Sequence, residues 1–261
     1  MKNIDFKKLL VLIVIIVVAV LAIIGIAKIA KNIGGPNKET VKAVEELVKD
    51  YYVDLSYGNS SIYNGGDLLY DKDKVTFADL NKGSIIELAI DYATKTDKDI
   101  AINTAASAYF KKTYKVDGNG FNAKAIKEAV KELFGEDLEL KTYFATPTYL
   151  YDYYYLDEFE AFFRTPSKTP NLNNENNFMS YYIVETKGSK KAPETVVAVA
   201  YVYYNGSNYT YAADKNGTKI VASGLEKNEF PKDKIDEFTK FVFKTKKVDD
   251  RYVFDSLEKV K

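Results

Sequence analysis

The chain has 261 residues, of which 46% are hydrophobic and 28% are charged, the balance of a globular domain that can bury a core. It contains no Cys, His or Trp, which excludes disulfides, thiolate chemistry, Cys-ligated metals and histidine-based proton transfer. Acidic and basic residues both number 37. Six of these charges flank the apolar N-terminal segment: Asp5, Lys2, Lys7, Lys8, Lys28 and Lys31. Without them, the rest of the chain has 36 acidic and 32 basic residues, a net charge of −4. We therefore expect no nucleic-acid partner.

Residues 9–27 form an unbroken apolar run of 19 residues. At about 1.5 Å per residue such a helix nearly spans a hydrocarbon core of about 30 Å. The sequence therefore predicts a cytoplasmic tail at 1–8 and a transmembrane anchor at 9–30, with the lipid bilayer as its partner. A cleaved signal peptide is the alternative, because Gly25-Ile26-Ala27 has the small-x-small pattern of a cleavage site, although the apolar region of a signal peptide is normally about 7–15 residues long.

The lysines on the two sides of the apolar run nearly balance: Lys2, Lys7 and Lys8 precede it, and Lys28, Lys31 and Lys38 follow it. We expect the short N-terminal tail to stay in the cytoplasm and the long C-terminal part, residues 39–261, to lie outside the cell membrane. Residues 31–38 contain Gly34, Gly35 and Pro36 and are interpreted as a short linker, which would hold the domain close to the membrane.

Three helices are expected in the first part of the domain. Apolar residues recur at three- and four-residue steps from Glu39 to Tyr51, and a second helix is expected at 84–95. The third has the clearest signals, because Asn122 is a suitable N-cap, the segment from Ala125 to Phe134 carries an apolar stripe, and Gly135 is a typical stop. These helices define a helical lobe at about 39–137.

After Gly135 the apolar period shifts to two, which indicates strands, with turn signals such as Asn205-Gly206 and Asn216-Gly217 between them. Strands are expected at 138–145, 149–155, 178–187, 195–204, 209–213, 219–222, 238–246 and 252–260. The predicted fold class is α+β, with the helical lobe followed by a mostly antiparallel β lobe at about 138–261.

Three features together resemble uncharacterised single-pass surface proteins of low-GC Gram-positive bacteria. They are the Lys-bearing tail with its apolar run, the helix that ends in Leu133-Phe134-Gly135, and the closing hairpin that begins at Phe241 and continues through Tyr252. The resemblance implies a bacterial, membrane-anchored protein of the cell envelope. It assigns no active residues.

Alternating tyrosines mark the predicted strand at 149–155. Tyr149, Tyr151, Tyr153 and Tyr155 share one face, and the residues between them share the other. Such a row of rings is a candidate ligand-binding ridge for sugars or a peptide. Tyrosine is also favoured in sheet cores and cross-strand pairs, so core packing is the alternative and the commoner role.

Four carboxylates follow in the same region: Asp152, Asp157, Glu158 and Glu160. Two facing carboxylates beside aromatic rings are the minimum requirement of a glycan-cleaving enzyme, which needs them about 5–5.5 Å or about 6.5–9.5 Å apart across one cleft. A solvated strand end explains the same residues.

Two further motifs match poorly. Asp117-Gly118-Asn119-Gly120 begins like a calcium loop, but Phe121 and Asn122 stand where an oxygen ligand and a turn glycine are needed. Ser256 and Lys259 have the spacing of Ser/Lys acyl enzymes, but they fall in a predicted strand and would point to opposite faces. We expect no metal site and no cofactor. The favoured hypothesis is a non-catalytic envelope module that contacts another envelope protein or a wall polymer, and the alternatives are a glycan-cleaving enzyme and a structural subunit of a membrane complex.

Overall fold

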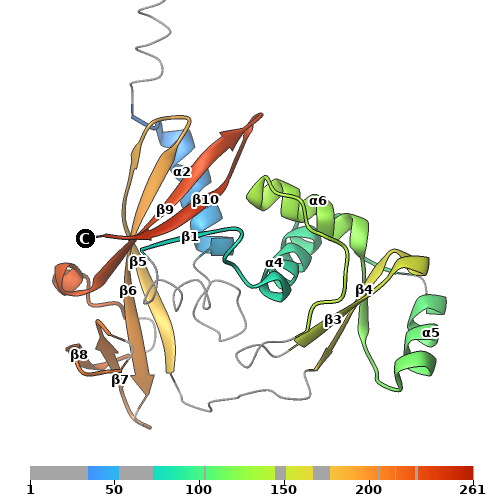
Figure 1. Ribbon diagram of the computed structural model, residues 1–261. Coiled ribbons are helices and arrows are strands. Elements are labelled where there is room, and N and C mark those ends of the chain that lie inside the picture. Colours follow the sequence, from blue (N-terminus) through green and yellow to red (C-terminus); the bar gives the residue numbers. More distant parts are fainter. Residues whose placement is uncertain are drawn as a thin grey trace, which may run out of the picture.

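The computed structural model describes most of the domain that follows the linker, in segments at residues 35–52, 73–102, 104–144, 151–166, 177–204, 206–214, 216–226 and 229–260. These residues form helices and antiparallel sheets, which confirms the α+β class (Figure 1). The expected anchor at 9–30 lies outside the described residues. Within the described residues, none of the helices combines the length and the apolar character needed to cross a membrane.

The first described helix follows the linker directly. Helix α2 (Lys38–Leu47) continues as a turn of π-helix, η1 (Val48–Tyr52), and its N-cap Asn37 accepts a hydrogen bond from the Thr40 amide at 2.8 Å. Val44 and Val48 are fully buried against the larger sheet. The expected helix after Glu39 is therefore confirmed.

Two further expected helices are also confirmed. Helix α4 (Lys82–Lys95) and helix α6 (Ala123–Phe134) pack against each other. Asn122 caps α6 by accepting a hydrogen bond from the Lys124 amide at 3.0 Å, and Gly135 ends it in the left-handed conformation with φ of 70°. A side chain at Gly135 would also crowd Val253, whose Cγ2 lies 3.2 Å from the position of an added Cβ.

The large sheet contains seven antiparallel strands (Figure 1). Its order is β1 (Lys74–Thr76), β10 (Arg251–Lys259), β9 (Thr239–Val248), β6 (Pro193–Tyr204), β7 (Tyr209–Ala212) and β8 (Ile220–Leu225), and β5 (Asn177–Gly188) also pairs with β6. Six of these strands confirm the expected ones after residue 177, and only the three-residue β1 was not predicted.

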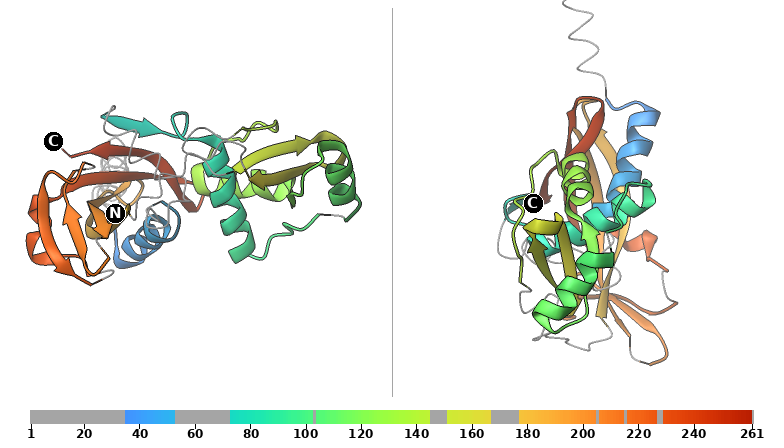
Figure 2. Two further views of the ribbon diagram at one scale, coloured as in Figure 1. Left: turned by 90° about the horizontal axis from the view of Figure 1, so that it is seen from below. Right: turned by 90° about the vertical axis from the view of Figure 1, so that its right-hand side faces the viewer.

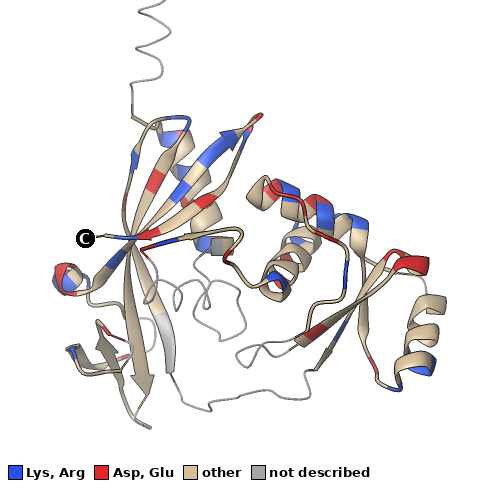
Figure 3. Cartoon of the chain, viewed as in Figure 1, with Lys and Arg blue, Asp and Glu red and all other residues tan. Residues whose placement is uncertain are grey.

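The central strand β6 is buried on both faces. Val197 and Val199 face α2 and belong to the main core. Ala198 and Val202 face the other way and belong to a second core. That core includes Phe230 and Phe238, which flank the 3-10 helix η3 (Lys232–Glu237). Toward β1 the strands β9 and β10 carry both acidic and basic residues (Figure 3).

A second, three-stranded sheet has the order β2 (Asn119–Asn122), β4 (Ala161–Pro166) and β3 (Tyr151–Leu156). A single 3-10 turn, η2 (Asp157–Phe159), joins β3 to β4. Helix α5 (Thr104–Tyr114) covers one face of this sheet, and α4 and α6 lie on the other side (Figures 1 and 2). We call this sheet with α4, α5 and α6 the small lobe; α5 forms its end farthest from the large sheet.

The small lobe and the large sheet share one hydrophobic core. The Phe134 ring of α6 lies 5.9 Å from the Phe254 ring of β10, and Arg251 pairs with Glu132 at 2.9 Å. Residue 137 was the predicted boundary between the helical lobe and the β lobe, and packing joins segments from both sides of it. Strand β2 pairs with β4, and α2 lies on β5 and β6.

The sequence expectation was wrong at one strand and, besides β1, missed three further elements. Residues 138–144 lie outside the named strands and contribute a single bridge between Tyr143 and Tyr153. Leu138 and Leu140 alternate toward the core as a strand would, but the segment lacks a continuous partner. Helix α5 and the strands β2 and β4 were not predicted.

Candidate functional site

The tyrosines of β3 that were predicted to form a binding ridge face the main core. Tyr153 is fully buried and donates a hydrogen bond from its hydroxyl to Glu87 of α4. Tyr151 and Tyr155 are half-buried and pack against the same core, and Tyr149 lies outside the described residues. Because Tyr153 has no exposed surface, this face of β3 cannot offer a continuous row of rings to a ligand.

An ion pair reinforces this inner face. Arg164 of β4 pairs with Glu87, and the two side chains are 22% and 18% exposed. The Arg164 guanidinium lies 5.3 Å from the Phe121 ring and 4.9 Å from the Tyr151 ring, so it is held between two aromatic faces. One of only two arginines in the chain thus fixes the small sheet to α4.

The opposite face of β3 leads to an exposed group of rings. Tyr154 points toward α5, where it contacts Phe110 and Tyr114, and it also contacts Phe144, while Phe159 of η2 packs on Tyr109 of the same helix. We call this group the aromatic strip, which consists of Tyr109, Tyr114, Phe144, Tyr154 and Phe159. Phe144 is 67% exposed, and Tyr109 and Tyr114 are each 39% exposed, whereas the other two rings are half-buried.

Helix α5 positions two rings of the strip. Its inward residues Ala106 and Phe110 are buried, and the Phe110 ring stacks on Phe163 of β4 with centroids 4.3 Å apart. Tyr109 and Tyr114 flank this buried stripe, so they emerge at the border between α5 and the sheet. A change that removes Phe110 would therefore detach both exposed rings.

Ring contacts hold the strip in a fixed arrangement. Tyr109 packs on Phe159 with ring centroids 5.1 Å apart, and Tyr114 stacks on the buried Phe110 at 4.7 Å. Tyr154 lies 5.0 Å from Tyr114 and meets Phe144 edge-on at 5.7 Å. Rings that are already ordered lose little conformational entropy when a ligand binds.

Acidic groups border one end of the strip. A hydrogen bond to Glu158 raises the pKa of the Tyr109 hydroxyl, and burial, followed by the nearby Asp152, raises the pKa of Tyr154. Both phenols therefore stay protonated over the physiological range. Figure 3 shows the acidic residues gathered at the turn between β3 and β4.

The four carboxylates proposed as catalytic candidates do not share one environment. Asp152 is buried, at 8% exposure, whereas Asp157, Glu158 and Glu160 lie on the exposed turn around η2. Asp157 accepts a hydrogen bond from the Tyr155 hydroxyl at 3.2 Å. Three of the four thus stand on one segment, whereas glycan cleavage needs two that face each other across a cleft.

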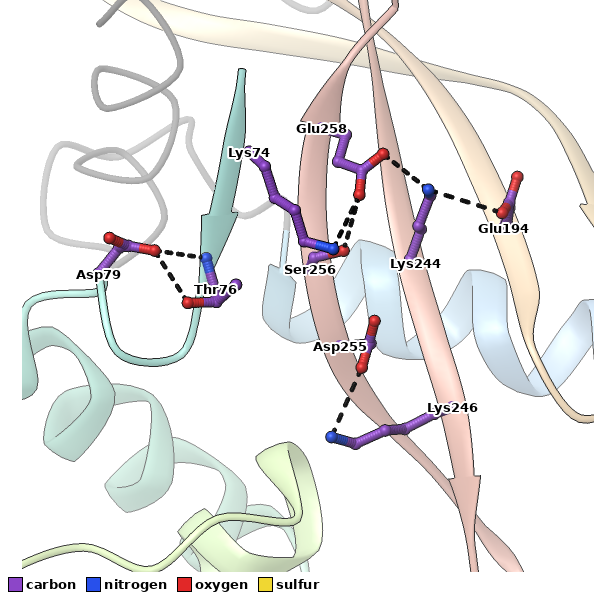
Figure 4. A network of polar contacts seen from close by, with 9 residues as sticks. All are labelled: Lys74, Thr76, Asp79, Glu194, Lys244, Lys246, Asp255, Ser256 and Glu258. Atoms are coloured by element: carbon purple, nitrogen blue, oxygen red, sulfur yellow. Dashed lines mark hydrogen bonds and ion pairs between the residues drawn. The ribbon is translucent and has the colours of Figure 1, made fainter. Parts of the chain in front are cut away.

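A different kind of surface covers the large sheet on the face opposite α2. Figure 4 shows a charge ladder across four strands, which consists of Lys74, Glu258, Lys244 and Glu194. Glu258 lies 3.1 Å from Lys74 and 2.6 Å from Lys244, and Lys244 is 3.9 Å from Glu194. Each charge has an opposite neighbour, so the ladder is neutralised within the protein. Ser256, once weighed as a nucleophile, is buried in β10 beside it.

A shallow groove runs beside α2, close to the linker. Its volume is about 400 Å³, and it is lined by Pro36, Lys38, Val41, Lys42, Glu45, Glu46, Lys49 and Ile183. Lysines and glutamates alternate along it, and Lys42 pairs with Glu46 at 3.7 Å. This mixed, solvated lining favours no particular ligand.

Among the described residues no group of three or more acidic side chains is arranged to hold a metal ion. Asp117, the first residue of the calcium-like motif, pairs with Lys111 at 2.7 Å. Comparison of the chain with protein-family models, with curated proteins and with solved structures finds no match. The chemistry of the described surfaces is therefore the basis for a functional proposal.

The sequence located β3, but its predicted ridge lies on the face that packs on the main core, and the exposed rings lie beside the other face. Tyr154 was assigned to the side opposite the candidate ridge, and the ring cluster on that side depends on α5, which was not predicted. One signal was present: Tyr109 and Tyr114 surround Phe110 in an eleven-residue segment that contains no Gly or Pro.

Proposed function

We propose that this chain is a single-pass membrane protein whose folded part is a non-catalytic binding module, and that the aromatic strip is its contact surface. The observation that carries this proposal is that Phe144, which is 67% exposed, and Tyr109 and Tyr114, each 39% exposed, border the same helix and sheet edge, where Tyr154 contacts Tyr114 and Phe144 and Phe159 contacts Tyr109. Large apolar side chains are exposed singly on most protein surfaces, whereas contiguous exposed patches mark interaction sites. A partner in the cell envelope, either a protein or a wall polymer, would cover these rings.

Two features of the sequence support a membrane tether: the apolar run at 9–27 and the short distance in sequence from that run to α2. With the N-terminal tail in the cytoplasm, the module stands on the outer face of the membrane. The small lobe would then present α5 away from the large sheet, which follows the linker more closely through α2 (Figure 1).

Protease treatment of intact cells tests the topology. We expect added protease to remove the domain and to leave a membrane-retained fragment of roughly the first thirty residues. Protection of the domain until the cells are lysed would contradict the outward orientation. Release of a mature domain that begins near Lys28 would show a cleaved signal peptide instead of an anchor.

Photo-crosslinking in cells tests the binding surface. A photoreactive phenylalanine analogue replaces Phe144 in the strip, and in a control it replaces Ile220 of β8, which is 59% exposed on the large sheet. We expect adducts from position 144 only, and we expect them to disappear when Tyr109 and Tyr114 are both changed to Ser. Equal adducts from the two positions, or none from position 144, would contradict the proposal.

Binding is favoured over glycan cleavage because the exposed carboxylates beside the strip share one turn. A cleaving enzyme would need Glu158 or a neighbour to face a second carboxylate across a cleft. Glu158 instead raises the pKa of the neighbouring Tyr109 hydroxyl.

A further inference from the structure

The size of the exposed aromatic surface restricts the kind of partner. An aromatic side chain offers about 150–250 Å², and the exposed fractions of Tyr109, Tyr114 and Phe144 then leave roughly 300 Å² of ring surface in water. A specific protein–protein interface buries about 800 Å² on each partner. The rings by themselves supply less area than such an interface needs, whereas a narrow ligand can rest on them alone.

The shape of the strip points the same way. Tyr109 and Tyr114 lie about 140° apart around α5, on the two sides of the buried Phe110. Phe159 continues the row beyond Tyr109, and Tyr154 and then Phe144 continue it beyond Tyr114. Ring-sized contacts at such intervals suit a chain of ring-sized units, in which each unit rests on one aromatic side chain.

Charge complementarity separates the possible narrow ligands. The turn at one end of the strip presents Asp157, Glu158 and Glu160, which as carboxylates only accept hydrogen bonds and repel anions. At the other end, Lys111 is paired with Asp117, and Lys112 and Lys115 are exposed nearby in sequence. The hydroxyl groups of an uncharged ligand can donate hydrogen bonds to these carboxylates, whereas the negative charges of an anionic polymer would be repelled by them.

We propose that the aromatic strip binds an uncharged glycan chain, whose sugar rings pack on Tyr109, Tyr114 and Phe144 and whose hydroxyls donate hydrogen bonds to the acidic turn at Asp157 and Glu158. This inference rests on the proposed function of the strip as a contact surface and names its ligand class. The apolar faces of pyranose rings supply the contact that tyrosine and phenylalanine favour, and tryptophan and arginine, which the strip lacks, are not required.

Calorimetric titration of the full chain with chitohexaose, in a detergent that carries no sugar headgroup, tests the proposal. We expect saturable binding that weakens at least tenfold in Tyr109→Ser/Tyr114→Ser and in Phe144→Ser. The matched control is Tyr204→Ser, because Tyr204 is 37% exposed on the large sheet and stacks on Tyr209 at 4.8 Å. Binding in this control should be unchanged. Phe144→Ser removes the most exposed ring and therefore keeps the test valid if the double variant does not fold.

Three results would overturn the glycan assignment. The first is that the protein binds none of chitohexaose, cellohexaose and purified peptidoglycan. The second is that the strip variants bind these ligands as well as the wild type does. The third is that the protein prefers anionic polygalacturonate. The crosslinking at position 144 distinguishes a failure of the glycan assignment from a failure of the proposed binding function. Adducts that contain only protein would reject the glycan but retain the contact surface, whereas strip-independent adducts would reject both.

Discussion

The large sheet and the small lobe differ in the kind of side chain that each exposes on its outer side. On the large sheet the part of the face opposite α2 that lies toward β1 carries the charge ladder, in which Glu258 and Lys244 neutralise each other and their neighbours. On the small lobe the outer side carries exposed rings instead. Paired charges in water contribute little binding energy, whereas exposed apolar surface gains free energy when it is covered. The contrast supports the proposal that the small lobe is the part that binds.

The two faces of the small sheet should differ most in their contribution to stability. Tyr153→Ala removes a fully buried ring and leaves Glu87 without its hydroxyl donor, so we expect the free energy of unfolding to fall by about 3–5 kcal/mol. Tyr114→Ala removes a ring that is 39% exposed and stacks on Phe110, so it should cost less, about 1–2 kcal/mol. Urea denaturation of a soluble form that begins at Gly35 measures both values. Similar losses would mean that the strip is core.

The ion pair beneath the small sheet should show strong coupling. Arg164→Leu strands the half-buried Glu87 charge, and we expect a loss of about 2–3 kcal/mol, below the range for a fully buried pair because both side chains keep some contact with water. The variant Glu87→Leu/Arg164→Leu should lose less than the sum of the single changes, with a coupling of about 1–2 kcal/mol. Additive losses would show that the pair contributes no interaction energy.

The charge ladder should respond weakly to acid. The hydrogen bond from Lys244 is the main cause that lowers the pKa of Glu258, and Lys74 contributes further. A depressed folded pKa gives stability that is present above the unfolded value of about 4.3 and is lost as pH falls through the folded value.

We therefore expect the melting temperature of the wild type to fall more steeply than that of Lys244→Met below about pH 4.3. The difference should correspond to less than about 1 kcal/mol, because the ladder is partly exposed. Parallel curves for the two proteins would show that the ladder is not coupled to folding.

The sequence predicted elements well where local signals were strong. Asn122 and Gly135 bounded α6 correctly, and the period-two pattern located β5 to β10. Strand β4 was missed because it is buried on both sides, between α5 and the helices behind it, and so shows an apolar run without alternation. Helix α5 was missed because only Ala106 and Phe110 are buried, a stripe too short to mark a helix.

The candidate site could be predicted only in part, because tertiary packing decides which side of a strand meets water. Alternation placed Tyr153 and Tyr154 on opposite faces correctly. It could not show that α4 covers the first and leaves the second beside an open edge of α5. Phe144 joins the strip from a segment that forms only one bridge to β3, and no local pattern predicts that approach.

Lateral diffusion of the full chain in the cell membrane tests most directly whether a tethered module binds through the strip. Single molecules labelled at the C-terminus are tracked for the wild type, for Tyr109→Ser/Tyr114→Ser and for Tyr204→Ser. Because a tethered module that binds a wall polymer or a large complex is slowed by it, we expect the strip variant to diffuse several-fold faster than the wild type, and we expect Tyr204→Ser to match the wild type. Equal mobility of all three proteins would contradict the assignment of binding to the aromatic strip.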